Sequence, residues 1–343
     1  MSVDDRSPRD RVFQTLADFW SAQAVHAAAR LGLADHLAER PRSAAELAAA
    51  TRTHAPSLAR LLRALAAAGL LRESAGRYRL TPFGEALRTG TPGSLRPLVL
   101  TSLGGEHYRA WGSLPHSIET GRPAFDHVYG QSIRDYYTRH PEEAAVFNDA
   151  MTAGTAAIGP AVLEAFDFSP YRTVVDVGGG HGGFLASILE ANPGARGVVF
   201  DAPHVVTGAR DQLAARGLAG RCEAVGGDFF ESVPSGGDLY VMKWIIHDWD
   251  DQRALRILRS CRQAIASSGG RLLLVESVLT EDGETFGPLL DLVMLVMAGG
   301  KERTEGEHRS LLAEAGFALT AVRATHSRVS LVEAEPVPAG RVG

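Results

Sequence analysis

A glycine-rich turn between two short apolar runs carries the most chemically suggestive residues of the chain. The run 173–177 is interrupted by Asp176 and is followed by five glycines within positions 178–183. A segment with helical periodicity and a second apolar run then lead to Asp201. This order of strand, glycine turn, helix, strand and acid is typical of a nucleotide-binding βαβ unit. Glycines let the backbone approach a ligand closely, and the acid can accept hydrogen bonds from ribose hydroxyls.

The glycine turn alone does not identify the ligand. Gly178, Gly180 and Gly183 satisfy the G-x-G-x-x-G spacing, which nicotinamide-dependent dehydrogenases share. A glycine-rich turn without any ligand is a second alternative, although the strand context and Asp201 argue against it. What separates a dinucleotide from another adenosine ligand must come from the rest of the chain.

Further acidic, aromatic and histidine residues follow the other apolar runs of this half. Asp228 and Phe229 can meet the exocyclic amine and the ring of an adenine. His247 comes at the end of the next run, has an acid beside it, and is expected near Glu276 and Glu302. Ligands of open parallel sheets bind at the carboxyl ends of the strands, so these side chains are predicted to meet at one edge. A lone histidine there is usually structural, but the surrounding acids favour a functional role for His247.

The elements that would position these residues alternate between strands and helices. Helical segments with apolar stripes separate the runs, which predicts an α/β sheet covered on both faces. Residues 336–343 are expected to be a disordered tail. The expected strands are 173–177, 197–200, 221–225, 238–246, 271–278, 318–324 and 330–335.

The first part of the chain reads as helix, helix and hairpin, the order of a winged helix. Residues 1–90 hold 13 arginines and 9 acidic residues, so their net charge is only +4. Such a small excess gives a thin phosphate-binding surface, and the second helix is mostly alanine and leucine. This region is therefore expected to form a dimer rather than to bind DNA.

Residues 106–165 are expected to be helical and are rich in aromatics and histidines. Phe147, Met151 and Thr155 follow one another along one face of the helix that begins near Pro141. Two interpretations stay open here, a core helix and an aromatic lid over a flat apolar substrate.

The totals describe an ordinary globular chain. Its 343 residues are 45% hydrophobic and 22% charged, with a net charge of −5. Neither nucleic acid nor a membrane surface is expected as a partner on these grounds. Two cysteines are too few for a disulfide framework or a zinc site. The N-terminus lacks a signal-peptide pattern and no apolar run reaches membrane-spanning length, so a cytoplasmic protein is expected.

Six sequence blocks together resemble one known family. They occur in a fixed order over nearly the whole chain, and their number makes the resemblance much more specific than the glycine turn alone. The chain resembles the plant-type, caffeic-acid-like small-molecule O-methyltransferases, in their bacterial secondary-metabolism branch. The blocks are VVDVGGGHGGF, VVFDAPHVV, GDFFESVP, KWIIHDWDD, LLLVESVL and DLVMLVMAGGKERTEGE.

The resemblance implies a fold, a cofactor and a partner. The fold is a Rossmann-like class I methyltransferase domain over 166–337, whose mostly parallel seven-stranded sheet has an antiparallel final strand. A winged-helix dimerisation domain over 1–105 and a helical connector over 106–165 precede it. The cofactor is S-adenosylmethionine (SAM), which leaves as S-adenosylhomocysteine, and no metal is implied. The partners are a small aromatic acceptor and a second copy of the chain.

The resemblance also assigns roles to individual residues. His247 is the general base, Glu276 and Glu302 orient it, and Asp248 contacts the substrate. The cofactor set is Thr155, Asp176, Gly178, Gly180, Asp201, Asp228, Phe229, Lys243 and Trp249. The acceptor pocket is expected to include Phe147, Met151, Asp291, Met294 and Met297.

The implied reaction is methyl transfer to a hydroxyl, most simply a phenol, of an aromatic secondary metabolite. The alternative is a SAM-binding relative that hydroxylates or decarboxylates a polyketide. The acceptor itself, the position methylated and the pathway do not follow from the sequence.

Overall fold

The computed structural model describes residues 7–266, 269–280 and 285–338. They form two compact units, one from residues 1–109 with 137–154, and the other from 110–136 with 155–343. Each unit is described by itself. In the part of the chain that is described, no helix combines the length and apolar character needed to cross a bilayer.

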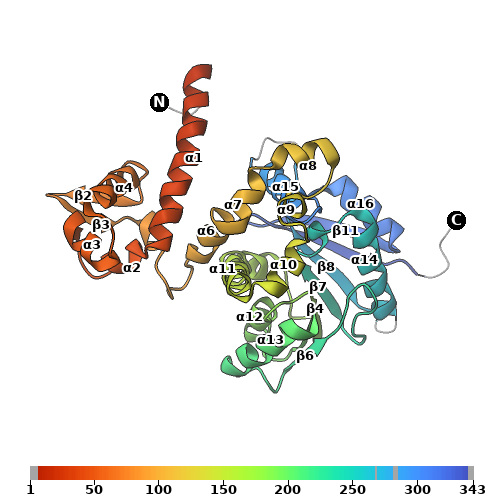
Figure 1. The fold of residues 1–343 in the computed structure, drawn as a ribbon. Helices are drawn as coiled ribbons and strands as arrows, with labels where there is room; N and C mark the ends of the chain where they lie inside the picture. Colours follow the sequence, from red (N-terminus) through yellow and green to blue (C-terminus); the bar gives the residue numbers. More distant parts are fainter. Residues whose placement is uncertain (1–6, 267–268, 281–284, 339–343) are drawn as a thin grey trace. The chain divides into compact units, whose positions relative to one another are not determined.

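The first unit contains the expected helices and hairpin (Figure 1). A Ser43–Glu46 capping box starts α3, as the spacing predicts. Its three short strands pair antiparallel in the order β1-β3-β2. The elements are α1 (Pro8–Arg30), α2 (Leu33–Leu37), β1 (Arg42–Ser43), α3 (Ala44–Thr51), α4 (Ala55–Ala67), β2 (Leu71–Ser74), β3 (Arg77–Leu80), α5 (Pro82–Glu85) and α6 (Arg96–Ser102).

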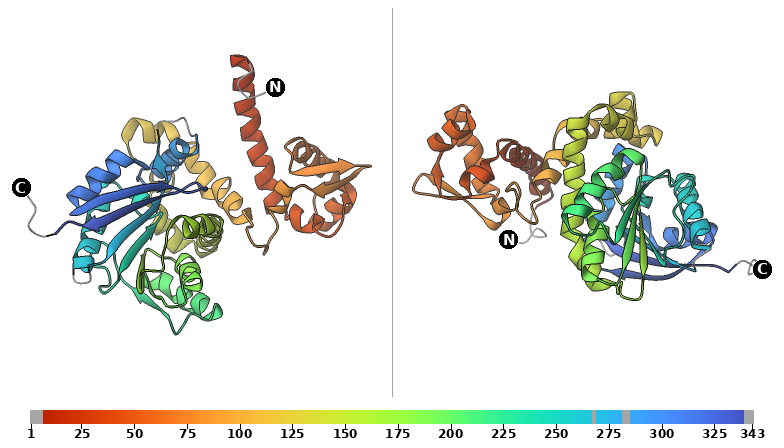
Figure 2. Two further views of the ribbon diagram at one scale, coloured as in Figure 1. Left: turned by 180° about the vertical axis from the view of Figure 1, so that it is seen from behind. Right: turned by 90° about the horizontal axis from the view of Figure 1, so that it is seen from below.

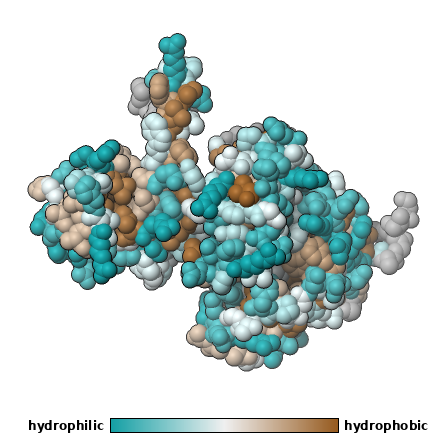
Figure 3. Space-filling view, in the orientation of Figure 1, coloured by the Kyte–Doolittle hydropathy of each residue, from teal (hydrophilic) through white to brown (hydrophobic). Residues whose placement is uncertain are grey.

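One face of α1 exposes large hydrophobic side chains. Phe13 is 69% exposed and Trp20 is 63% exposed, with Val12, Leu16 and Phe19 beside them in sequence. Hydrophobic atoms on this helix are visible in Figure 3. A contiguous apolar face of this kind on a soluble domain marks an interaction surface.

Five helices connect the two halves of the sequence and divide between the units. Residues 110–136 belong to the second unit, whereas 137–154 belong to the first. The helices are α7 (Gly105–Trp111), α8 (Leu114–Thr120), α9 (Ala124–Tyr129), α10 (Ile133–Arg139) and α11 (Pro141–Ala165).

The second unit is built on a seven-stranded sheet with the order β11-β12-β8-β7-β4-β5-β6. The strands β8, β7, β4, β5 and β6 are parallel to one another, whereas β12 runs antiparallel to both β8 and β11. The α/β class and the antiparallel final strand are therefore confirmed. The strands are β4 (Thr173–Val177), β5 (Arg196–Asp201), β6 (Cys222–Gly226), β7 (Leu239–Lys243), β8 (Arg271–Glu276), β11 (Phe317–Ala324) and β12 (Ser330–Pro336).

Helices cover both faces of this sheet (Figure 2). Because adjacent residues of a strand point to opposite faces, Val174 packs with one core and Val175 with the other. The final part of α11, with α12 (Gly183–Ala191) and α13 (Pro203–Ala215), contributes to the first core. The helices α14 (Asp251–Ala266) and α16 (Glu305–Glu314) contribute to the second. The remaining elements are η2 (Ile246–Asp248), β9 (Val278–Leu279), α15 (Phe286–Met297) and β10 (Arg303–Thr304).

Three sequence-based boundaries are wrong. The strand expected over 238–246 ends at Lys243, because Trp244 has a left-handed backbone with φ of 56°. The strand expected over 271–278 ends at Glu276. Pro336 was expected to belong to a disordered tail, but it still pairs with Phe317 in the sheet. Residues 339–343 lie outside the described residues.

Candidate active site

His247 lies on a short turn rather than on a strand. After the left-handed residue Trp244, residues 246–248 form one turn of 3₁₀ helix at the carboxyl edge of the sheet. A left-handed, non-glycine residue is uncommon and ends the strand abruptly. The turn therefore places His247 beside the ends of β7 and β8 instead of continuing along β7.

The imidazole of His247 is held by carboxylates on one side. Its Nδ1 lies 2.7 Å from Oε1 of Glu302 and 3.8 Å from Oε2 of Glu276. The residue is 8% exposed, and its Nε2 lies 3.7 Å from Oδ1 of Asp248. With Nδ1–H donated to Glu302, the neutral ring has its free lone pair on Nε2. Nε2 is thus the atom that can accept a proton.

Glu276 holds the backbone of this turn in addition to placing a carboxylate beside the imidazole. Its Oε1 accepts hydrogen bonds from the amides of Ile245 at 3.1 Å and Ile246 at 2.9 Å. Its Oε2 is buried without a hydrogen-bond partner, as is Oε2 of Glu302. Two buried carboxylate oxygens therefore retain acceptor capacity next to the imidazole.

The charges around His247 change its affinity for protons. Burial lowers the pKa of His247, but the charge of Glu276 and the hydrogen bond that the ring donates to Glu302 outweigh burial and raise the pKa to about 9. Burial raises the pKa of Glu276 to about 7, which opposes the effect of Glu276 on the ring, because a protonated Glu276 carries no charge. We take the pKa of His247 to be raised, since its hydrogen bond to Glu302 persists in either state of Glu276.

His247, Glu276 and Glu302 also have the side-chain types of a metal site, and their ligand atoms lie within 4.8 Å of one another. Ligands that bind one ion at about 2.1 Å and at right angles lie about 3 Å apart. The separation of 2.7 Å between Nδ1 and Oε1 is shorter and is that of a strong hydrogen bond. The arrangement therefore favours a hydrogen-bonded triad.

The glycine turn and Asp201 form a second, connected part of the edge. Gly178 and Gly180 have φ of 73° and 58°, values that residues other than glycine rarely adopt. A Cβ on Gly178 would also collide with the side chain of Ile245. The carboxylate of Asp201 accepts hydrogen bonds from the amides of Gly180 at 2.8 Å and Ala202 at 2.7 Å. The structure thus brings these predicted cofactor residues together.

Asp176 is buried beneath the turn, and Lys243 beside it is half-buried. Burial raises the pKa of Asp176 to about 7, and the charge of Lys243 opposes this shift. Burial lowers the pKa of Lys243 to about 8, and Asp176 opposes that shift in turn. Oδ2 of Asp176 is buried without a hydrogen-bond partner, which costs about 1–3 kcal/mol unless a ligand supplies one.

An aromatic cluster follows β6. Asp228 accepts a hydrogen bond from the amide of Phe230 at 2.8 Å. The ring of Phe229 meets Trp249 edge-on at 6.0 Å, and Phe230 meets it edge-on at 4.7 Å. The guanidinium of Arg134 lies 3.7 Å from the centre of the Trp249 ring. One face of Trp249 is therefore covered by an arginine within the same unit.

Of the expected acceptor residues, three lie on α15. Oδ1 of Asp291 accepts a hydrogen bond from the backbone amide of Glu302 at 2.8 Å, so it supports the triad directly. Met294 is buried, and Met297 packs in a small core cluster with Phe125.

The remaining predicted residues lie along α11. Phe147 and Met151 lie on the part of α11 that belongs to the first unit, where Phe147 stacks on Tyr137 at 4.8 Å. Thr155 begins the part of α11 that belongs to the second unit.

Three residues that sequence reasoning missed contact the His247 turn. Arg134 pairs with Asp248 at 3.2 Å, from a helix 114 positions earlier in the chain. Gly300 packs so closely that a Cβ would collide with the carbonyl oxygen of His247. Arg303 is 1% exposed and donates to the carbonyls of Ile246 and Trp249. The sequence indicated these residues only indirectly, since Gly300 and Arg303 lie in GGKERTEGE, part of one of the six blocks that carry the family resemblance.

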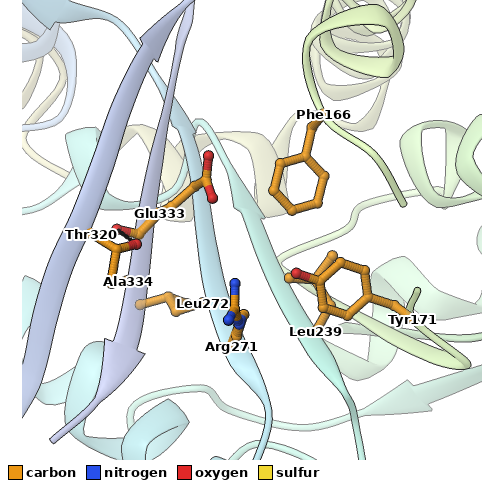
Figure 4. A pocket seen from close by; sticks show the side chains of 8 residues that line it. All are labelled: Phe166, Tyr171, Leu239, Arg271, Leu272, Thr320, Glu333 and Ala334. Carbon is orange, nitrogen blue, oxygen red and sulfur yellow. Dashed lines mark hydrogen bonds between the residues drawn. The ribbon is translucent and has the colours of Figure 1, made fainter. Parts of the chain in front are cut away.

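A small cavity at the opposite edge of the sheet contains none of these residues (Figure 4). It measures about 10 Å³, room for roughly one water molecule. It lies at the amino end of β7 and β8, whereas His247 and Asp201 follow the carboxyl ends of their strands. Its lining residues are Phe166, Tyr171, Leu239, Arg271, Leu272, Thr320, Glu333 and Ala334.

Comparison with known families agrees with this geometry. The O-methyltransferase domain matches residues 111–318, and the O-methyltransferase dimerisation domain matches residues 13–90. The chain belongs to the O-methyltransferase family. It is accordingly a SAM-dependent O-methyltransferase with an N-terminal dimerisation domain.

Similar proteins support the same conclusion over nearly the whole length. The phenazine O-methyltransferase PhzM of Lysobacter antibioticus is 45% identical over 328 residues, which cover 95% of this chain and 96% of the relative. The 3-amino-4-hydroxybenzoate 4-O-methyltransferase of Streptomyces cremeus is 45% identical over 91% of this chain and 86% of the relative. The structure of the O-methyltransferase NcsB1 from neocarzinostatin biosynthesis, with SAM and 2-hydroxy-5-methyl naphthoic acid, has a TM-score of 0.78. It is 39% identical, covering 92% of this chain and 96% of that one. The hydroxylase or decarboxylase alternative has no support among these relatives.

Proposed function

We propose that this O-methyltransferase methylates a phenolic hydroxyl of an aromatic secondary metabolite, with His247 as the general base. The observation that carries the proposal is the hydrogen bond of 2.7 Å between Nδ1 of His247 and Glu302. That bond fixes the ring so that Nε2 can take the hydroxyl proton. Asp248, 3.7 Å from Nε2, is suited to accept a second hydrogen bond from the acceptor.

The pKa of the base suits a phenol. A phenol of pKa about 10 would give its proton to an ordinary histidine of pKa about 6.5 at a cost of about 5 kcal/mol. With the pKa of His247 raised to about 9, the cost falls to about 1.4 kcal/mol. Glu276 and Glu302 thus make the histidine a stronger base, and the neutral form increases as the pH rises toward 9.

The carboxyl edge also fits the cofactor. The glycine turn lets the backbone approach a ligand closely, Asp201 presents its carboxylate to ribose, and the unpartnered Oδ2 of Asp176 can accept a hydrogen bond. Bound SAM supplies an electrophilic methyl group on a sulfonium. The full set that we propose to hold it is Thr155, Asp176, Gly178, Gly180, Asp201, Asp228, Phe229, Lys243 and Trp249.

The acceptor is proposed to be a flat, hydroxylated ring system. The names of the relatives specify a phenazine, a hydroxybenzoate and a hydroxynaphthoate as their acceptors. Apolar side chains with one acid are suited to bind such rings. We propose Phe147, Met151, Asp291, Met294 and Met297 as the lining of the acceptor pocket.

We further propose that the enzyme is a cytoplasmic homodimer that binds neither nucleic acid nor membranes. The exposed apolar face of α1 lies within the matched dimerisation domain, so a second copy is its natural partner. The proposed domain limits are 1–105 for dimerisation, 106–165 for the connector and 166–337 for catalysis.

The test is an activity assay with labelled SAM and a panel of hydroxylated phenazines, benzoates and naphthoates. We expect at least one product whose mass increases by one methyl group. Binding is measured separately as a thermal shift with S-adenosylhomocysteine, with NAD as the control ligand. A stabilising shift with NAD alone, or a product that gained oxygen or lost carbon dioxide, would contradict the proposal.

A further inference from the structure

We propose that Arg303 is a positioning residue that holds the turn of His247 in its catalytic place. The inference rests on the proposed role of His247 as the base. Arg303 touches neither the imidazole nor the carboxylates of the triad in any described hydrogen bond. Its guanidinium instead contacts the backbone on both sides of His247.

The contacts of Arg303 enclose the turn. Its Nη1 donates to the carbonyl of Ile246 at 3.0 Å, and its Nη2 donates to the carbonyl of Trp249 at 2.9 Å. Its Nε and Nη2 also donate to Oδ1 of Asp251 at 3.0 and 2.8 Å, so the first turn of α14 anchors the guanidinium. The planar fork of arginine reaches three acceptors in fixed directions, which a lysine ammonium does not reproduce.

Glu276 holds the same turn through its amides. The amides of Ile245 and Ile246 donate to Glu276, whereas the carbonyls of Ile246 and Trp249 accept from Arg303. A buried anion therefore satisfies the N–H groups of the turn and a buried cation satisfies its C=O groups. The backbone of Gly300 packs against the turn and leaves no room for a Cβ. These contacts restrict the turn from several directions.

This restriction matters because the base must meet two partners at once. Nδ1 must stay 2.7 Å from Glu302 while Nε2 faces the acceptor hydroxyl. A displacement of about 1 Å in a catalytic group can lower turnover by about 10²-fold. Loss of the guanidinium would remove the donor to the carbonyl of Trp249, would leave the carbonyl of Ile246 with only the amide of Trp249, and would free the turn to move.

The experiment compares Arg303→Met and Arg303→Lys in the full-length enzyme, each assayed with a hydroxylated acceptor. We expect Arg303→Met to lower kcat by about 10- to 100-fold, with the KM for SAM changed by no more than about 3-fold. Arg303→Lys should recover part of this loss, because it keeps the charge but not the fork. If Arg303→Met does not fold, Arg303→Lys decides the question, with an expected loss of roughly 3- to 10-fold.

Arg221 provides a matched control. Its guanidinium donates to four backbone carbonyls near the amino ends of the strands, those of Leu189, Asn192, Pro193 and Ala195. Arg221→Met should therefore lower the melting temperature and leave kcat within about 2-fold of the wild type. The control separates the loss of guanidinium–carbonyl hydrogen bonds in general from the loss of those at His247.

A double-mutant cycle decides whether Arg303 acts through His247. In a His247→Ala background, the additional Arg303→Met change should alter kcat by less than about 2-fold, because the base it positions is gone. An equal loss in both backgrounds, or wild-type kcat in Arg303→Met and Arg303→Lys, would overturn the inference. Wild-type turnover in the His247→Ala single variant would contradict the proposed role of His247 as the base. Because that result comes from a different variant, it can be distinguished from a failure of the inference about Arg303.

Discussion

The two edges of the catalytic sheet use the same kinds of polar groups with different results. At the amino edge, Asp238 accepts hydrogen bonds from the amides of Arg172 and Thr173, both at 2.9 Å, and Arg221 donates to four carbonyls. At the carboxyl edge, Asp176, Glu276 and Glu302 each keep one buried oxygen without a partner. These hydrogen bonds at the first edge join loops to the strands and stabilise the fold. The second retains unused acceptors and raised pKa values, which is the usual physical state of an active site.

The largest expected difference between the edges comes from His247. His247→Ala should lower kcat by about 10²- to 10⁴-fold, the usual contribution of a general base. The thermal shift with S-adenosylhomocysteine should stay near the wild-type value, since His247 is not in the proposed cofactor set. Steady-state kinetics and thermal-shift titration measure the two effects. Unchanged kcat would show that alignment of the acceptor alone suffices.

Asp201 is expected to have the next largest effect, on cofactor binding. Asp201→Ala removes a carboxylate that both orders Gly180 and faces the proposed ribose site. Hydrogen bonds to charged groups contribute about 1.5–3 kcal/mol, so the KM for SAM should rise by about 10- to 100-fold. Steady-state kinetics measure the KM for SAM, and isothermal titration measures the Kd of S-adenosylhomocysteine. An unaltered Kd would place the cofactor away from this strand end.

Glu276 should have a smaller effect, seen mainly in the pH dependence. Wild-type kcat/KM should rise with pH toward about 9, because the neutral form of His247 is the base. Glu276→Gln removes the negative charge that raises the pKa of His247, so this limb should move to lower pH. The amide oxygen of Gln can still accept from the turn. The measurement is kcat/KM of both enzymes over roughly pH 6 to 10. A rising limb at the same pH in the wild type and in Glu276→Gln would contradict the electrostatic role of Glu276.

Asp238 at the amino edge should affect stability alone. Asp238→Ala leaves the amides of Arg172 and Thr173 without their acceptor and should lower the free energy of unfolding by about 1–3 kcal/mol. Its kcat should stay within about 2-fold of the wild type. Urea denaturation and steady-state assays test the two statements. A loss of kcat comparable to that expected for Arg303→Met would remove the distinction between the edges.

Much of the fold followed from patterns that are local in sequence. The glycine turn, the strand that ends at Asp201 and the capping box at Ser43 were all predicted, because each depends on backbone conformation or on neighbours within a few positions. The predicted strand through 246 was wrong, since apolar residues continue past Lys243 while the left-handed conformation of Trp244 turns the chain away. A hydrophobic pattern does not record a change of backbone direction inside an apolar run.

By itself, the sequence determined the family, the type of cofactor and the edge of the sheet at which the candidate site residues gather. Ordered motifs and strand periodicity carry this information, because both are properties of residue type and spacing. The resemblance already assigned Glu302 to orient His247, but only tertiary structure decided that it is Glu302, 55 positions beyond His247, that binds Nδ1 directly, and that Arg303 holds the same turn. Hydrogen bonds of this kind depend on distances and angles of a few tenths of an ångström, which only the packed helices and strands define.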